Sequence, residues 1–360
     1  MTATAERTAE VYTTPRPSIW ARIFDRWQVK LAVTIIVILW VIPTLGLFIT
    51  SFRVSDAINT SGWWTVFTNI GENEWTLSNY TEVLDRAGFG NAFLNSLAVT
   101  IPSTVIPITI AAFAAYGFAW MDFRGRNLLF VLVVALLVVP LQMALIPILR
   151  LYTSGGHLST WLLVAILLAA TISAAVFLLQ RRGGVIPLVF FGLLTIGAGA
   201  LWLNGTEVVT IFPDLNLNGT FLAVWLAHTG FGLPLAIYLL RNYMGSLPSS
   251  IVESAEIDGA DHFTIFTRLM VPLSVPVLAS FAIFQFLWVW NDLLIALIFL
   301  GGEPKNQVLT QALMELNSSR GNEWQLLTAG AFISMMLPLT VFFALQRFFV
   351  RGLTAGSVKG

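Results

Sequence analysis

Few side chains in this 360-residue sequence could carry out covalent or metal chemistry. Cysteine is absent, which excludes disulfides, thiolate metal sites and a cysteine nucleophile. The three histidines, His157, His228 and His262, lack the short spacing of metal-binding histidines. No Gly-x4-Gly-Lys-[Ser/Thr] string is present, so the sequence has no loop of this kind to cradle nucleotide phosphates. We therefore predict no catalytic residue and no bound metal.

Several polar side chains lie inside or beside long apolar stretches. Polar groups at membrane depth are costly, so they mark substrate pathways or helix contacts. Neutral hydrogen-bonding groups beside flat aromatic rings could hold a polar, uncharged solute such as a sugar. The same groups could instead bond neighbouring helices, and the tryptophans could form an interfacial belt. The candidates for a substrate path are Gln142, His228, Gln285, Trp288, Asn291 and Asp292.

The composition indicates that lipid is part of the solvent. Charged residues make up 11% of the chain and hydrophobic residues 57%, and the mean hydropathy is +0.80. About a quarter of the residues of a soluble protein are charged. Zero net charge and a pI near 6.8 argue against a nucleic-acid binder, which would show a basic surface. The sequence thus predicts an all-α integral membrane protein rather than a soluble enzyme.

Eight stretches are long and apolar enough to cross a hydrocarbon core of about 30 Å, which needs roughly 20 residues. The only formal charges inside them are Asp292 and Arg347. Arg347 lies in the last turn of its stretch, where a long side chain can reach the headgroups. The predicted spans are 31–51, 95–119, 128–149, 159–179, 185–203, 219–240, 272–299 and 327–349.

Lysine and arginine are unevenly divided between the two sides of these spans. With the N-terminus inside, 14 of the 19 fall in cytoplasmic segments, which is the bias that orients membrane proteins. Eight spans then place both termini in the cytoplasm. The predicted organisation is a cytoplasmic N-terminal segment (1–30), a first transmembrane part (31–152), an inserted transmembrane hairpin (153–218), a second transmembrane part (219–350) and a cytoplasmic tail (351–360).

The longest cytoplasmic loop between spans, 241–272, is predicted to contain two short helices. Ser250 and Glu253 have the spacing of a capping box, so the first helix should begin there. Gly259 lies where the chain can change direction without steric cost. An exposed apolar surface normally marks a docking site. The apolar side chains that the second, amphipathic helix should present to the cytosol are Phe263, Phe266, Leu269 and Met270.

This loop resembles the EAA loop of importer-type ABC transporter permeases. The family pattern Glu-x-Ala-x3-Gly-x9-[Ile/Leu]-x-[Leu/Val]-Pro is matched by Glu253, Ala255, Gly259, Leu269, Val271 and Pro272. Ser254 replaces the first alanine of the family string. Further strings resemble the carbohydrate subfamily, and within it the second permease subunit of maltose and alpha-glucoside systems: Asn95–Ser96, Ala115–Tyr116–Gly117, Ile257–Asp258–Gly259–Ala260, Trp290–Asn291–Asp292 and the tail from Gly352 to Gly360. The likeness covers about 1–150 and 219–360.

The resemblance implies a six-helix permease core into which the two-helix hairpin is inserted. It also implies that the loop is a coupling helix docked on a separate ATPase. The tail residues Gly352, Gly356 and Lys359 would reach the same ATPase. The implied coupling residues are Glu253, Ala255, Asp258, Gly259, Ala260, Phe263, Phe266, Leu269 and Pro272.

The same resemblance implies one permease subunit of an ATP-driven sugar importer in the bacterial inner (cytoplasmic) membrane. Its partners would be a second permease subunit, two ATP-binding subunits that hold ATP and magnesium, and an extracytoplasmic sugar-binding protein. The chain itself would bind no cofactor and no nucleic acid. One alternative is an importer permease for peptide, polyamine or amino acid. The other is an ion-coupled secondary transporter, which would need acidic groups deep in the bundle, whereas Asp292 is predicted near the outer interface.

Overall fold

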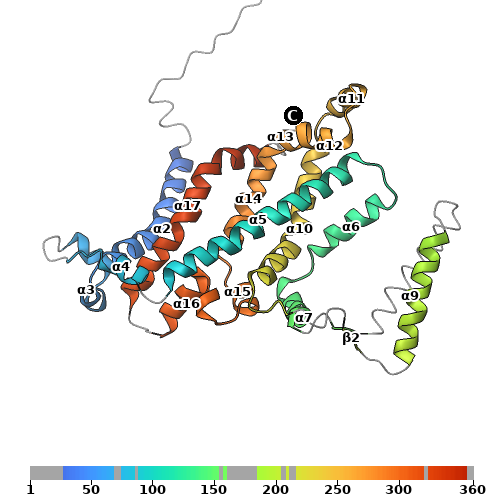
Figure 1. Cartoon of the computed structure of the whole chain (residues 1–360). Helices are drawn as coiled ribbons and strands as arrows, with labels where there is room; N and C mark the ends of the chain where they lie inside the picture. Colours follow the sequence, from blue (N-terminus) through green and yellow to red (C-terminus); the bar gives the residue numbers. More distant parts are fainter. Residues whose placement is uncertain are drawn as a thin grey trace, which may run out of the picture.

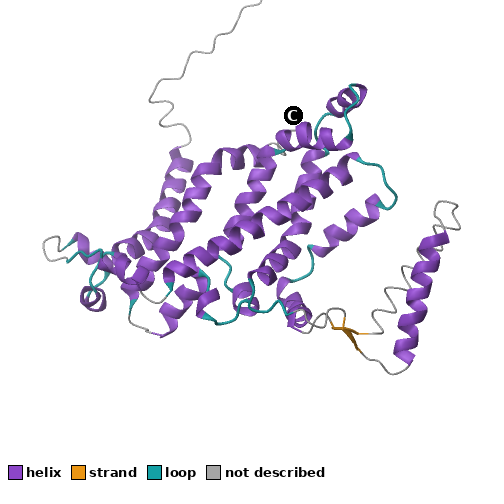
Figure 2. Ribbon diagram, in the orientation of Figure 1, coloured by secondary structure: helices purple, strands orange, loops and turns teal. Residues whose placement is uncertain are grey.

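The computed structural model describes residues 27–68, 74–85, 88–153, 157–159, 185–203, 208–210, 216–319 and 323–354. In this part the chain is almost entirely helical (Figures 1 and 2), which confirms the prediction of an all-α protein. The elements are α2 (Trp27–Ser51), α3 (Ser55–Thr60), η1 (Trp63–Phe67), α4 (Ser78–Asp85), α5 (Phe89–Trp120), α6 (Arg126–Leu136), α7 (Leu141–Thr153), β1 (His157–Ser159), α9 (Val185–Leu203), β2 (Val208–Thr210), α10 (Phe221–Met244), α11 (Ser249–Ile257), α12 (His262–Ile265), η2 (Phe266–Met270), α13 (Val271–Leu273), α14 (Val275–Trp290), α15 (Leu294–Phe299), η3 (Pro304–Asn306), α16 (Leu309–Ser319) and α17 (Trp324–Thr354).

Four of these helices, α2, α5, α10 and α17, are long and apolar enough to cross a membrane. Two bent pairs, α6 with α7 and the segment 262–273 with α14, raise the number to six if each pair is one span. Helix α9 coincides with the predicted stretch 185–203. Residues 160–179 of the predicted span 159–179 and the segment 1–26 lie outside the described residues.

Two predicted spans are not the straight helices that the sequence suggested. The stretch 128–149 breaks between α6 and α7, whose axes differ by 100°. Pro140 lies in this break, where it removes a backbone donor and disfavours a helical conformation in the preceding residue. The stretch 272–299 stops as a helix at Trp290. There Asp292 accepts hydrogen bonds from the backbone N–H groups of Ile295 and Ala296 and so starts α15 afresh.

The centre of the bundle is α5, which packs along α10 and against α14. Helix α17 packs on α14 and α2. Fully buried small residues, Ala111 and Ala115 of α5 and Ala236 of α10, let these backbones approach closely. Figure 1 shows the start of α2, the C-terminal end and α11–α12 at one end of the bundle, and α3, α15 and α16 at the other.

The described parts of 153–218 leave the bundle and return to it at one place. Strands β1 and β2 pair antiparallel, with His157 opposite Thr210. Beyond them, the backbone N–H of Leu217 donates to the carbonyl of Tyr152 at 3.0 Å. Figure 1 shows α9 to one side of the other helices.

Candidate functional site

Loop 241–272 folds as two helices at a sharp corner. The first, α11, ends in a Schellman motif: the N–H of Gly259 donates to the carbonyl of Glu256 at 3.0 Å, and that of Ala260 donates to Ala255 at 2.9 Å. Gly259 has φ +80°, a left-handed conformation that glycine adopts at little cost. A Cβ at Gly259 would meet nothing within 4 Å, so this position requires glycine for its backbone angle and not for space. The predicted change of direction at Gly259 is confirmed.

The second helix, α12, is fixed at both ends. Asp261 caps its start by accepting from the N–H of Thr264 at 2.8 Å. The hydrogen bonds from Thr264 hold the pKa of Asp261 below its usual value. The Tyr116 hydroxyl of α5 lies 3.0 Å from Nδ1 of His262. The ring of Phe266 packs 4.5 Å from that of Phe113. These contacts join α12 and the following turn to α5.

The structure corrects which apolar side chains of the loop face outward. Phe263 is 64% exposed, as predicted, but Phe266 and Met270 are buried and Leu269 is half-buried against the core. The π-helical turn η2 (Phe266–Met270) directs this face to α5 and α10 instead of to solvent. Amphipathicity alone could not tell which neighbour would cover it. Sequence reasoning also missed Ile257, which is 85% exposed next to the corner.

The predicted capping box is wrong. Helix α11 begins at Ser249 after Pro248, and no side chain caps it, because Ser250 already lies inside the helix. The other predicted coupling residues divide into two groups. Glu253, Asp258, Gly259 and Pro272 are exposed, whereas Ala255 and Ala260 are half-buried and pack on the cluster beneath the loop. The exposed face also carries the carboxylates of Glu256 and Asp261 and is therefore rich in acidic groups.

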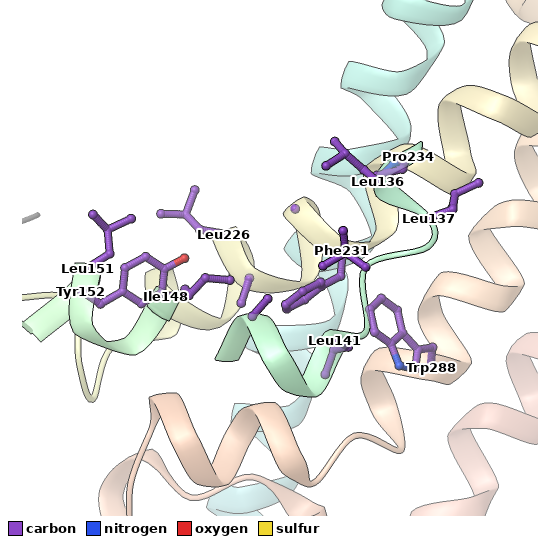
Figure 3. Close-up of a pocket in the computed structure, with 14 residues that line it drawn as sticks. Leu136, Leu137, Leu141, Ile148, Leu151, Tyr152, Leu226, Phe231, Pro234 and Trp288 are labelled. Atoms are coloured by element: carbon purple, nitrogen blue, oxygen red, sulfur yellow. The ribbon is translucent and has the colours of Figure 1, made fainter. Parts of the chain in front are cut away.

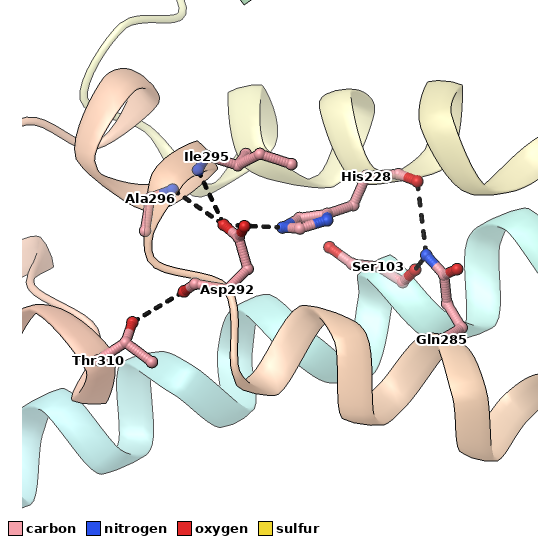
Figure 4. Close-up of polar contacts among 7 residues, drawn as sticks. All are labelled: Ser103, His228, Gln285, Asp292, Ile295, Ala296 and Thr310. Carbon is pink, nitrogen blue, oxygen red and sulfur yellow. Dashed lines mark hydrogen bonds and ion pairs between the residues drawn. The ribbon is translucent and has the colours of Figure 1, made fainter. Parts of the chain in front are cut away.

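A second group of predicted residues meets inside the bundle (Figure 4). His228 of α10 is 1% exposed, and its Nε2 lies 3.8 Å from Oδ2 of Asp292. Gln285 of α14 is 3% exposed and donates through Nε2 to the carbonyls of Ser103 at 3.1 Å and His228 at 3.4 Å. The break after α14 turns the partly buried carboxylate of Asp292 towards His228. The group links α5, α10, α14 and α15.

Prolines leave three backbone carbonyls in the bundle without their usual helical donor, and side chains of other helices donate hydrogen bonds to these carbonyls. In a helix the carbonyl of residue i accepts from the N–H of residue i+4, and proline has no such N–H. Pro107 thus frees Ser103, which accepts from Gln285. Pro102 frees Ala98, which accepts from Trp225 Nε1 at 3.0 Å. In α17, Pro338 frees Ser334, which accepts from Trp290 Nε1 at 3.0 Å.

Of the remaining path candidates, Trp288 borders this buried group, and Gln142 and Asn291 are exposed. Trp288 packs edge-on to His228, with ring centroids 5.0 Å apart, and its other side lines a cavity of about 400 Å³ (Figure 3). This cavity lies at the bend between α6 and α7, against α10, and its lining includes Leu137, Leu141, Tyr152, Phe231 and Pro234. Gln142 is exposed near the start of α7. Asn291 is exposed and donates to the carbonyl of Leu287.

The predicted tail contacts are only partly described. Gly352 lies near the end of α17, whereas Gly356 and Lys359 lie outside the described residues.

Comparison with known proteins identifies the family. Residues 107–355 match the model of the binding-protein-dependent transport system inner membrane component. The chain belongs to this family. It is thus a multi-pass inner membrane permease of a bacterial ABC importer, a transport subunit and not an enzyme, as predicted. Membership also agrees with the prediction that the permease holds no cofactor, and it implies a binding protein and ATPase subunits as partners.

Two relatives match the permease over nearly its whole length. An osmoprotective compounds uptake permease protein, GgtD, of Synechocystis sp. is 49% identical, and the match covers 92% of this chain and 93% of the relative. An alpha-glucoside transport system permease protein, AglG, of Rhizobium meliloti is 40% identical, with 93% and 97% covered. A solved bacterial ABC transporter that imports alginate matches with a TM-score of 0.57 and 17% identity, over 93% of this chain and 100% of that one. The likeness to the alginate transporter concerns the fold alone.

Proposed function

We propose that this permease is one half of the translocation pathway of an ATP-driven importer for sugars or sugar-like osmolytes. A second permease subunit supplies the other half, and two ATPase subunits supply the energy. The names of the two relatives support this substrate range, since one carries osmoprotective compounds and the other alpha-glucosides. The sequence resemblance to the carbohydrate subfamily supports the same range.

The observation that carries the coupling role is the exposed corner of loop 241–272. Ile257 and Phe263 are 85% and 64% exposed, although large apolar side chains are normally buried. They flank a corner whose position is fixed by the turn at Gly259 and by the contacts of Phe266 and Tyr116. If a groove on an ATPase subunit covers Ile257 and Phe263, a movement of that subunit would move α12. The contacts between α12 and α5 would then move α5 with it. Glu253 and Asp258 are exposed on α11 and at its end, and they and the tail are proposed to add polar contacts.

Among the six path candidates, Trp288 is the proposed contact with the solute. It lines the 400 Å³ cavity, and the flat apolar face of an indole suits the apolar face of a sugar ring. His228, Gln285 and Asp292 are proposed to hold the helices that shape the pathway, since Nε2 of His228 faces Oδ2 of Asp292 and the side chains of Gln285 and Asp292 form hydrogen bonds with backbone groups. Gln142 and Asn291 remain candidates because their exposed side chains could face a solute.

The proposed topology has eight spans, with both termini and loop 241–272 in the cytoplasm and 153–218 as an inserted hairpin. The distribution of lysine and arginine supports it. The start of α2 and the C-terminal end lie at the same end of the bundle as α11–α12, which also supports it, because these parts then share one side of the membrane (Figure 1).

The test is solute-stimulated ATP hydrolysis by the complete complex in proteoliposomes. Binding protein loaded with an alpha-glucoside or a neutral osmolyte should stimulate hydrolysis, whereas a peptide, a polyamine or an amino acid should not. Ile257→Ser should abolish stimulation with normal membrane insertion, because this side chain makes almost no contact within the chain. The matched control is Leu77→Ser, 67% exposed and outside the loop, which should keep it. Equal stimulation in both variants would refute the coupling role, and stimulation by the other solute classes alone would refute the substrate range.

A further inference from the structure

The segment that follows α2 folds back along that helix. The indole of Trp63 lies directly on the backbone of α2 at Gly46, because a Cβ there would come within 2.7 Å of Trp63 Nε1. Gly46 is one of three buried residues of α2, together with Ile49 and Ser51. The turn η1 is thus placed beside the last turns of the helix and not above its end.

Buried hydrogen bonds hold this arrangement in place. Arg53 is 2% exposed, and its guanidinium donates to the carbonyl of Ala57 at 2.9 Å and to Oγ of Ser61 at 2.6 Å. Asn79 of α4 donates to the carbonyls of Ser51 and Arg53 at 2.8 and 3.0 Å. The chain from the end of α2 to η1 is therefore a fixed extension of the helix.

Two large aromatic side chains of η1 point away from the rest of the chain. Trp64 is 62% exposed and Phe67 is 60% exposed. Their rings lie 6.1 and 6.3 Å from that of Trp63, in edge-to-face arrangements. Trp63 is thus the inner support of a three-ring group whose two outer members have apolar surface to bury.

The depth of this group follows from the length of α2. Its 25 residues span about 37 Å, which exceeds a hydrocarbon core of about 30 Å by some 4 Å at each end if the helix is centred. Gly46 lies five residues before Ser51, about 7.5 Å along the axis. Trp63 therefore contacts α2 within about 4 Å of the hydrocarbon boundary, close to the interface where tryptophans gather in membrane proteins.

The surface of α2 indicates what surrounds this group. Apolar side chains on all sides of the helix are exposed, as the four consecutive residues Ile36 at 60%, Val37 at 53%, Ile38 at 53% and Leu39 at 63% show. A partner subunit can cover only one side of such a helix, so lipid must cover much of the rest. We propose that Trp64 and Phe67 insert into the phospholipid headgroup layer as an interfacial anchor that fixes the depth and tilt of α2. This layer is at the end of the bundle opposite loop 241–272.

The absence of cysteine from the chain allows a direct test with single spin labels. Trp64→Cys, Phe67→Cys, Ile36→Cys and Asn59→Cys would each be labelled with a nitroxide in the complete complex, in nanodiscs of phosphatidylethanolamine and phosphatidylglycerol. Power saturation then compares collisions with oxygen, which concentrates in lipid, and with a water-soluble nickel chelate. Ile36 is the reference for the lipid core. Asn59, exposed on α3, is the aqueous reference.

We expect the oxygen-to-nickel ratio at 64 and 67 to be several-fold above that at 59 and below that at 36. A ratio equal to that at 59 would overturn the proposal. Low accessibility to both reagents would also overturn it, because a protein surface would then cover the rings. Both sites are at least 60% exposed, so the substitutions remove little internal packing, and unchanged ATP hydrolysis would verify intact complexes.

Discussion

The hydrogen bond from Gln285 to Ser103 should stabilise the bundle only because Pro107 is present. Ser103 cannot receive the usual helical hydrogen bond from residue 107, so its buried carbonyl depends on the Nε2 donor of Gln285 at 3.1 Å. Gln285→Met keeps the size of the side chain and removes the donor. An unsatisfied buried carbonyl costs about 1–3 kcal/mol, and hydrogen bonds between membrane helices average about 0.6 and reach about 1.7 kcal/mol. We expect Gln285→Met to destabilise the permease by about 1 kcal/mol.

Pro107→Ala restores the backbone donor and gives the Ser103 carbonyl a partner within its own helix. In that background Gln285→Met should cost about 0.5–1 kcal/mol less than in the native sequence. The cost should not vanish, since Gln285 also donates to His228 at 3.4 Å. The matched control is Pro102→Ala, because the carbonyl freed by Pro102 accepts from Trp225 and not from Gln285.

The assay is reversible unfolding in mixed micelles of mild detergent and sodium dodecyl sulfate, followed by circular dichroism. The four variants of the cycle give the coupling free energy between positions 107 and 285. A coupling below about 0.3 kcal/mol, which is within the error of additivity, would refute the argument. An equal coupling with Pro102→Ala would show that loss of any proline weakens α5 in general.

Three other predictions follow from the site. Gly259→Ala should uncouple transport from ATP hydrolysis, because a left-handed conformation costs a residue with a Cβ about 1–2 kcal/mol. Gly259→Asn should keep most of the coupling, because asparagine tolerates this conformation. Gly125→Ala, which introduces the same strain at φ +82°, should not uncouple transport from ATP hydrolysis. Uncoupling in all three variants would contradict the argument. Asp292→Ala should lower stability by about 1–2 kcal/mol through loss of two backbone hydrogen bonds, whereas Asp292→Asn keeps an acceptor and should lose less; thermal unfolding measures both, and equal losses would mean that the charge matters and not the hydrogen bonds. Deletion of 156–216 should leave solute-stimulated ATP hydrolysis intact, since the chain returns to the bundle where it left it; loss of stimulation in a well-inserted deletion would show that the segment takes part in coupling.

Much of the local architecture could be read from the sequence, because it depends on neighbouring residues. The apolar runs at α2, α5, α10 and α17 are long enough to cross a bilayer, and this alone makes them helical, since lipid offers their backbone groups no other partner. Gly259 likewise predicts a turn, because the hydrogen bonds of that turn join residues that are close in the sequence, Gly259 to Glu256 and Ala260 to Ala255. The bends in the helices were harder to predict from the sequence. Pro140 breaks a span, whereas Pro102 and Pro107 leave α5 unbroken, and Trp225 and Gln285 of neighbouring helices donate to the carbonyls that these two prolines leave free.

The orientation of side chains in the coupling loop was decided by tertiary contacts. Phe263 and Phe266 both belong to the apolar face of the same short helix. The structure buries Phe266 against Phe113 and Tyr116 and leaves Phe263 outside. No pattern within the loop distinguishes them, because the deciding surface belongs to α5.

The sequence by itself determined that this is a membrane-embedded permease with an EAA-like loop, since length, hydropathy and the loop motif are properties of contiguous residues. It also listed His228, Gln285 and Asp292 as the costly polar groups at depth. Only the tertiary structure decided that His228 faces Asp292 and that Gln285 reaches Ser103, 182 positions away. A proline in a helix predicts that the carbonyl four residues earlier lacks its helical donor. The side chain that donates to that carbonyl lies on another helix, and only the packing of the helices brings the two together.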